Sequence, residues 1–209
     1  MSQHALPIHK RLVNRLLNHF AYKSGGYTIP FLEEMLRHYS VAEVFRIFGA
    51  CTKIANALTH RYGPRDANVL IGFAAVWNGC RFCSRGHIWA ANLYHLRDTG
   101  ELFPLDDADV HAMQRMPDEE LLSKTLGLLQ DSQYARLRQL LQRQYHLKRG
   151  EAVGSTDEDD FLRAAIAAWD WMVECTIVVD DTGDVPADPI SSDRALLDRY
   201  LTLRGRKRR

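Results

Sequence analysis

One stretch of the chain carries two cysteines and a histidine in helical register, and it reads Trp77-Asn78-Gly79-Cys80-Arg81-Phe82-Cys83-Ser84-Arg85-Gly86-His87. On a helix, positions 80, 83 and 87 fall at i, i+3 and i+7, so they share one face. Two thiols one turn apart can close a disulfide, and an imidazole one turn further can take up or release a proton. The stretch therefore predicts a helix that bears a thiol redox or thiol acid–base site.

The residues on either side of this stretch are also helical in pattern. Residues 69–77 are apolar apart from Gly72 and Asn78 follows them; about 20 apolar residues are needed to span a bilayer, so this is a buried segment. The helix carrying the cysteines is expected to run over about 78–96. Further helices are expected at 8–22, 31–38, 41–60, 106–116, 118–131 and 132–146, with C-terminal helices over 156–203.

Local signals predict where several of these helices begin and end. Ser40 is expected to cap the third helix, Ser192 to cap the last, and Gly63-Pro64 to break the chain between 60 and 66. The acidic run at 157–160 is interpreted as the first turn of a helix, where the helix dipole favours carboxylates, in preference to a metal site. Residues 177–179 could form a short extended piece, and a Gly/Pro/Asp-rich loop is expected at 180–191.

The pattern has no strand-turn-strand signal and no internal repeat. It predicts a single all-α domain of about eight or nine helices over residues 1–203, followed by a basic, disordered tail at 204–209. The face of the first helix that carries Leu12, Leu16 and Phe20 is apolar.

The composition is that of a globular protein: 209 residues, 46% hydrophobic and 25% charged. A net charge of +1 gives no bulk electrostatic argument for nucleic acid or membrane, and neither is an expected partner. Residues 1–10 lack the pattern of a secretory signal, and four cysteines are too few for a disulfide scaffold. The expected location is the cytoplasm, where paired thiols are more often catalytic or metal-binding than structural.

Four interpretations of the cysteine motif compete. The thiols could be small buried hydrophobes. Cys80, Cys83 and His87 could hold zinc, with a fourth ligand from among Cys51, Cys175, His60 and His95. A c-type haem attachment is excluded because Ser84, not histidine, follows the second cysteine, and a thioredoxin-like site would need surrounding strands.

The fourth interpretation is a helical thiol oxidoreductase. With Asn78 as the cap, both cysteines would lie in the first two turns, where the helix dipole lowers a thiol pKa. Arg81 and Arg85 add positive charge nearby. Cys83 would attack, His87 would act as its base, and Cys80 would resolve the adduct into a disulfide.

The pattern Asn78-Gly79-Cys80-x-x-Cys83-x-x-x-His87, followed by Ala90 and Ala91, resembles the core motif of the AhpD-like superfamily, which includes the alkylhydroperoxidase D proteins and the carboxymuconolactone decarboxylases. The resemblance covers about 30 residues, 66–96. It implies an all-α fold and a homo-oligomer, commonly a dimer, trimer or hexamer. It also implies that the second cysteine attacks, the first resolves and the histidine relays protons, roles that carry onto Cys83, Cys80 and His87.

The resemblance implies an oxidoreductase with peroxidase activity and a redox-active disulfide. Its partners would be a small-molecule peroxide or related substrate and a dithiol reductant protein; no cofactor and no metal are expected.

Two positions depart from the family pattern. Peroxidase members have a glutamate twelve residues before the first cysteine, where this chain has Asn68, and some have a histidine where it has Phe82. An amide cannot pass on a proton as a carboxylate can, so another acid, such as Glu34 or Glu43, would have to substitute. The alternatives are a catalytically weak, oligomeric binding protein and a carboxymuconolactone decarboxylase-like enzyme, although the retained cysteine pair argues against the latter.

Three smaller expectations concern other residues. The basic tail is expected to be solvated. The four tryptophans are expected in the core or at subunit interfaces rather than as ligand clamps: Trp77, Trp89, Trp169 and Trp171. Cys51 and Cys175 are expected to be buried and inert.

Overall fold

The computed structural model describes residues 5–151, 156–171 and 188–206. Within these ranges the chain forms nine α-helices, two short 3-10 helices and no strand, which confirms the all-α prediction. The elements are α1 (Ile8–Gly25), α2 (Leu32–His38), α3 (Val41–Trp77), α4 (Arg81–Thr99), α5 (Asp107–Met113), α6 (Asp118–Leu128), η1 (Ser132–Tyr134), α7 (Ala135–Lys148), α8 (Asp157–Ala167), η2 (Pro189–Ser192) and α10 (Arg194–Leu203). The extended piece predicted at 177–179 and Cys175 lie outside the described residues.

Helix α3 is long and bent. It begins at a capping box in which the Ser40 side chain accepts from the backbone of Glu43 and Glu43 reaches back to Ser40. Gly63 interrupts it with φ 81° and ψ 160°, a conformation open to glycine, and Pro64 follows. The predicted break is thus confirmed as a kink between an outer half and an inner half of one helix.

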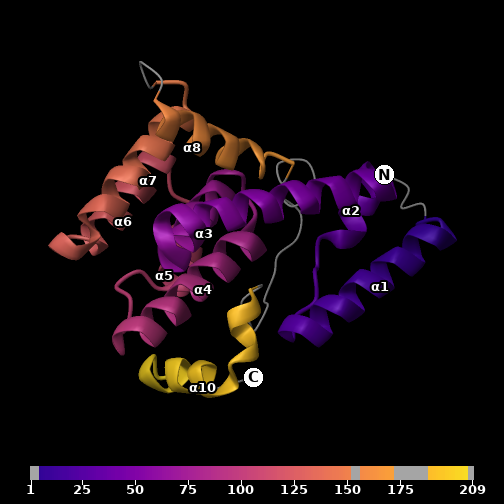
Figure 1. Cartoon of the computed structure of the whole chain (residues 1–209), viewed down its shortest axis with the longest axis horizontal. Helices are drawn as coiled ribbons and strands as arrows, with labels where there is room; N and C mark the ends of the chain where they lie inside the picture. The colour runs from indigo at the N-terminus through magenta and orange to yellow at the C-terminus, as the bar shows by residue number, and fades with distance from the viewer. Residues whose placement is uncertain (1–4, 152–155, 172–187, 207–209) are drawn as a thin grey trace.

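The inner half of α3 forms the centre of the molecule together with α4. Every residue from 67 to 76 is buried, and α4 folds back along this segment after a short turn (Figure 1). A Cβ at Gly72 would meet the Ile88 side chain at 3.0 Å and the Ser84 carbonyl oxygen at 3.4 Å. The glycine therefore lets the two helices approach closely beside the cysteine motif.

The other helices cover this pair from two directions. Helices α7 and α8 pack against each other and against α3, while α10 and η2 pack on α4 (Figure 1). A second apolar cluster, centred on Trp89, Leu93, Leu197 and Tyr200, joins α4 to α10.

Helix α1 lies along one side of the molecule and packs mainly on α2 and η2 (Figure 1). The predicted apolar face is present, but Leu12, Leu16 and Phe20 are all more than half exposed. An apolar stripe at helical spacing usually marks the face that a helix buries, so this stripe is an exception.

The helix caps differ from prediction at two places. Cys80, rather than Asn78, is the N-cap of α4, and Asn78 instead closes α3. Asp193, rather than Ser192, caps α10. The acidic run at 157–160 is confirmed as the first turn of α8, with Thr156 and Asp159 forming a capping box.

The tail is not disordered where it is described, which corrects the prediction for residues 204–206. The Arg204 guanidinium donates to Asn92 Oδ1 at 2.7 Å and to the Phe103 carbonyl at 2.6 Å. Arg206 donates to Asp107 Oδ1 at 2.7 Å and to Asp106 Oδ1 at 2.5 Å. Two arginines of the basic run are therefore held by fixed acceptors, of which Asn92, Phe103 and Asp107 are buried.

Candidate functional site: a thiol pocket at the start of α4

The turn that leads into α4 is fixed by contacts with the C-terminal half of the chain. Gly79 has φ 79°, which turns the backbone after α3. The Asn78 amide donates to the Trp169 carbonyl at 3.0 Å and accepts from Lys148. Asn78 therefore ties the motif to the ends of α7 and α8 rather than capping α4.

Cys80 is the N-cap of α4, and its sulfur replaces the oxygen usual at that position. The backbone N–H of Cys83 donates to Cys80 Sγ at 3.2 Å, and Cys80 is almost fully buried. A first-turn N–H directed at sulfur stabilises negative charge there. The two cysteines are thiols, adjacent at the N-cap and third helical positions.

Cys83 and His87 line a common pocket, whereas the buried Cys80 is not part of its lining. The pocket is a cavity of about 200 Å³. Its lining comes from four parts of the chain: Tyr27, Ile29, Phe31, Phe48, Cys51, Thr52, Ala55, Phe82, Cys83, His87, Trp169 and Trp171. Of the two motif thiols, Cys83 is thus the one that a pocket ligand can meet.

The ring of His87 is held by Asn68, one helix away on the inner half of α3. His87 Nδ1 lies 2.7 Å from Asn68 Oδ1, and Asn68 Nδ2 donates to the Pro64 carbonyl at 3.0 Å. Because the amide nitrogen is used on Pro64, the amide oxygen faces His87 and must accept its proton. This assigns the proton to Nδ1 and leaves the lone pair of neutral His87 on Nε2.

Burial lowers the pKa of His87 to about 4, and the negative charge of Asp188 opposes that shift. His87 is consequently neutral at physiological pH, and its Nε2 is a weak base. The partner of the ring is an amide where the resemblance would supply a carboxylate.

The substitute acids considered from sequence do not reach His87. Glu43 caps α3 through Ser40, and Glu34 pairs with His38 on α2, with Nε2 and Oε1 3.0 Å apart. Asp66 pairs with Arg65 at 2.6 Å. Asp188, at the start of η2, is the described carboxylate whose charge acts on His87.

Arg85, which was expected to add positive charge near the cysteines, is directed to an ion pair with α5. Arg85 Nε donates to Asp107 Oδ2 at 3.1 Å, and its guanidinium lies 5.8 Å from the centre of the Trp89 ring. Asp107 is almost fully buried. Arg85 therefore stabilises the packing of α5 on α4 instead of adding charge to the pocket.

Aromatic side chains form most of the pocket wall. Phe31 packs edge to face on Phe82 with ring centres 5.6 Å apart, and its ring centre lies 5.4 Å from that of Trp171. Trp169 stands at 84° to the His87 ring, 6.4 Å away. The described lining contains no carboxylate, lysine or arginine, so the pocket suits an apolar ligand.

Cys51 is the second thiol in the described pocket lining, beside Cys83, and the sequence analysis did not expect it at the site. It is half-buried, its sulfur lies 3.1 Å from the Ala168 carbonyl, and Trp171 Nε1 donates to it at 3.3 Å. Burial raises the pKa of Cys51 to about 11, so it is a neutral, unreactive thiol at physiological pH.

The zinc interpretation finds no support in the described part of the chain, where no three His, Cys, Asp or Glu side chains converge as metal ligands. His95, one of the fourth ligands considered, lies instead between Arg65 and Tyr134.

Trp169 and Trp171 were missed as site residues, and so was the role of Asn68 as the partner of His87. Trp169 and Trp171 lie more than 80 residues from the motif in sequence, and nothing local marks them. Asn68 was the one detectable signal, since it lies at the family's glutamate position.

Comparison of the chain with family models, curated proteins and solved structures finds no match. No helix among residues 5–151, 156–171 and 188–206 is both long enough and apolar enough to cross a membrane.

Proposed function

We propose that the protein is a thiol oxidoreductase that reduces peroxides at Cys83, as the AhpD-like motif implies. The observation that carries this proposal is that Cys83 and His87 line one apolar pocket, while the Cys80 sulfur lies 3.2 Å from the Cys83 backbone nitrogen at the N-cap. A nucleophile, a base and a resolving thiol are then in the order that the chemistry requires.

The first step is attack of the Cys83 thiolate on the outer oxygen of the peroxide. Neutral His87 Nε2 takes the thiol proton, the O–O bond breaks, and the leaving alkoxide takes that proton to become an alcohol. Cys83 becomes a sulfenic acid.

The second step forms the disulfide. Cys80 attacks the Cys83 sulfur, an S–S bond replaces the S–O bond, and water leaves with the Cys80 proton. A dithiol reductant then restores both thiols by exchange, becoming a disulfide itself. Each turnover reduces one peroxide and oxidises one dithiol.

Peroxide consumption with dithiothreitol as reductant tests the proposal. Turnover is expected for the wild type with hydrogen peroxide or cumene hydroperoxide, and Cys83→Ser should abolish it. Without reductant, Cys80→Ser should consume one equivalent of peroxide and stop at a sulfenic acid that dimedone traps. Cys51→Ser is the matched control, a pocket thiol outside the scheme, and should keep its rate. Equal inertness of wild type and Cys83→Ser would exclude the peroxidase.

The second candidate is a helical binding protein that keeps the motif but turns over weakly. The observation that favours it is the neutral amide on His87, which leaves the ring with a lowered pKa. The pH dependence of Cys83 alkylation separates the two candidates. A Cys83 pKa near 8.5, that of an ordinary thiol, favours the binding protein, and a clearly lower value favours the enzyme.

A further inference from the structure

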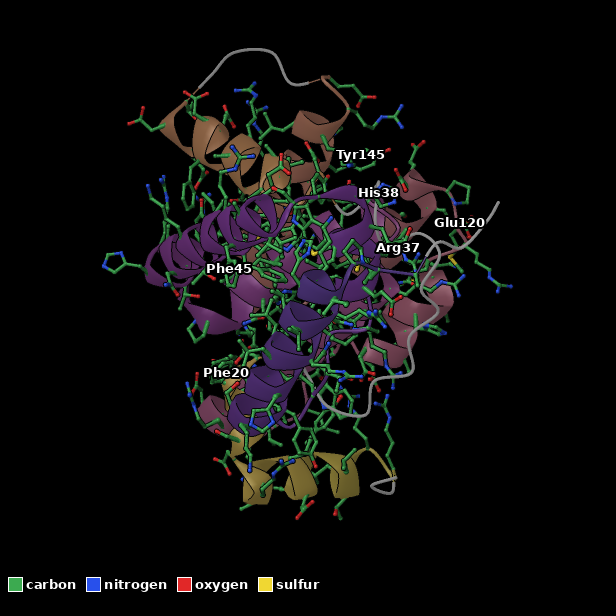
Figure 2. The ribbon with its side chains drawn as sticks, turned by 90° about the vertical axis from the view of Figure 1, so that its right-hand side faces the viewer. Phe20, Arg37, His38, Phe45, Glu120 and Tyr145 are labelled. Atoms are coloured by element: carbon green, nitrogen blue, oxygen red, sulfur yellow. The ribbon has the colours of Figure 1, made fainter. Side chains whose placement is uncertain are left out.

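The exposed face of α1 carries an apolar stripe. Ile8, Leu12, Leu16 and Phe20 recur every fourth residue and are between 53% and 69% exposed. At 1.5 Å per residue the stripe is about 18 Å long. In Figure 2, Phe20 of α1 and Phe45 of α3 project on the same side of the molecule, and Phe45 is about half exposed.

The charged side chains that α1 itself carries are all basic. Arg11, Arg15 and Lys23 are exposed on the same helix. The first carboxylate of the whole chain is Glu33, so α1 contains none. The net charge of +1 for the full chain conceals this local excess. A helix with an apolar stripe and cationic borders is complementary to an anionic, partly apolar surface.

Only one face of α1 is available for such a contact. Its opposite face is anchored by Lys10, which donates to the Leu36 carbonyl at 2.6 Å, and by Asn18, which accepts from the Ile29 backbone at 2.6 Å. The Gly25 carbonyl accepts from the Ser191 hydroxyl at 2.7 Å. A partner that must wrap the helix is excluded by this packing, whereas a flat surface needs only the exposed face.

Charge also argues against a second copy of α1 as the occupant. In an antiparallel pair of identical stripes, Leu12 would face Leu16 of the other copy, and Arg11 and Arg15 of both copies would lie along one seam. Like charges side by side are destabilising, and α1 has no acid to offset them. A layer of anionic headgroups above acyl chains satisfies the cations and the stripe together.

We propose that α1 binds an anionic lipid surface, lying in the plane of the headgroups with Ile8, Leu12, Leu16 and Phe20 inserted. This contact lies on the membrane surface and does not span the bilayer, in agreement with the finding that no described helix could cross a membrane. The inference does not depend on the chemistry of Cys83.

Flotation with lipid vesicles tests the proposal on the full-length protein. The probes are vesicles of phosphatidylcholine alone and vesicles in which about one third of the lipid is phosphatidylserine. Binding is expected to the anionic vesicles only and to weaken as salt is raised. Leu12→Glu with Leu16→Glu, and separately Arg11→Gln with Arg15→Gln, should each reduce binding at least about tenfold.

Matched controls use the opposite side of the molecule, where α6 lies in Figure 1. Leu128→Glu alters another exposed leucine, and Arg115→Gln with Lys124→Gln removes two exposed cations. These variants should bind like the wild type. Circular dichroism and melting should match the wild type for every variant, because all the changed side chains are exposed.

Three outcomes overturn the proposal. The first is no binding to either kind of vesicle, and the second is equal binding to both. The third is a wild-type protein that does not bind vesicles but forms a dimer in light scattering, where the dimer is lost in Leu12→Glu with Leu16→Glu. The last outcome would assign the stripe to a second copy of the chain.

Discussion

At the scale of single residues, Asn68 decides what His87 can do. It fixes the ring, because its amide nitrogen is used on the Pro64 carbonyl and its oxygen accepts from Nδ1. It does not raise the basicity of the ring, because an amide carries no charge. Orientation is therefore retained while electrostatic activation is absent.

Asn68→Asp should restore that activation. A carboxylate on Nδ1 favours the imidazolium form and should raise the pKa of His87 by about one to three units. It cannot donate to the Pro64 carbonyl, and loss of that hydrogen bond costs about 1 kcal/mol. NMR titration of His87 and the rate of Cys83 alkylation at neutral pH measure the effect, and alkylation should be several-fold faster. Asn56→Asp, the same change at an exposed position on the outer half of α3, is the control. An unchanged His87 pKa would contradict the assigned contact.

The lowered pKa of His87 also predicts how stability depends on pH. In the unfolded chain histidine has its ordinary pKa of about 6.5, so between about pH 6.5 and about pH 4 the unfolded state binds the proton first. The stabilisation is complete above that window and is lost as the pH falls through it. The loss is about 1 to 2 kcal/mol, because the His87 side chain is partly exposed and solvent weakens the effect of burial.

Urea unfolding at the two ends of this window measures the loss, and His87→Gln should make it smaller. Burial also lowers the pKa of His95, so part of the slope should remain in that variant. A slope unaffected by His87→Gln would show that the ring is not shielded from water.

At the scale of the element, the kink of α3 positions two residues of the candidate site. Gly63 separates an outer half, which carries Cys51 into the pocket, from an inner half, which carries Asn68 to His87. The bend lets one helix supply both a wall of the pocket and the residue that orients His87. Pro64 contributes as well, since its carbonyl is the acceptor that orients Asn68.

Gly63→Ala should destabilise the protein through backbone strain alone. The position has φ 81°, and a Cβ there would meet nothing within 4 Å, so no clash contributes. The expected loss in the free energy of unfolding is about 1 to 3 kcal/mol. Gly49→Ala, in open space within the same helix, is the matched control and should gain about 0.5 to 1 kcal/mol. Urea denaturation compares the two; a loss at both positions would refute the strain argument.

At the scale of the whole molecule, the last residues described hold the centre together. Asp107 is almost fully buried and accepts from Arg85 of α4, from Arg206 and from the Tyr200 hydroxyl at 3.1 Å. Burial raises the pKa of Asp107, and the guanidinium of Arg206 opposes that shift. Arg206 thus balances the negative charge of the buried Asp107, which lies beside α4.

Arg206→Ala should destabilise the protein by about 1 to 3 kcal/mol, because a buried carboxylate loses one of its two cations. Arg97→Ala, which removes a surface pair with Asp98, should cost less than about 0.5 kcal/mol. Thermal or urea unfolding distinguishes them. Equally small losses of stability in the two variants would show that Arg206 is a solvated tail residue and does not stabilise the fold.

The sequence by itself determined the features that depend on neighbours a few residues apart. Helix periodicity, the cap at Ser40, the acidic first turn at 157–160, the break at Gly63 and the shared face of the motif are local, because backbone hydrogen bonds and allowed φ angles are set within one or two turns. The sequence also marked Asn68 as a departure, but it did not indicate its contact with His87.

Only the tertiary structure decided the rest, since each contact joins residues far apart in the chain. Packing of α3 on α4 places Asn68 beside His87. The segment after α8 places Trp169 and Trp171 in the pocket lining, more than 80 residues after the cysteine motif in the sequence. Burial turned Arg206 from a tail charge into an ion-pair partner, and left the apolar stripe of α1 without one in the described chain. Sequence periodicity predicts that a helix has an apolar face, whereas tertiary packing determines what that face contacts.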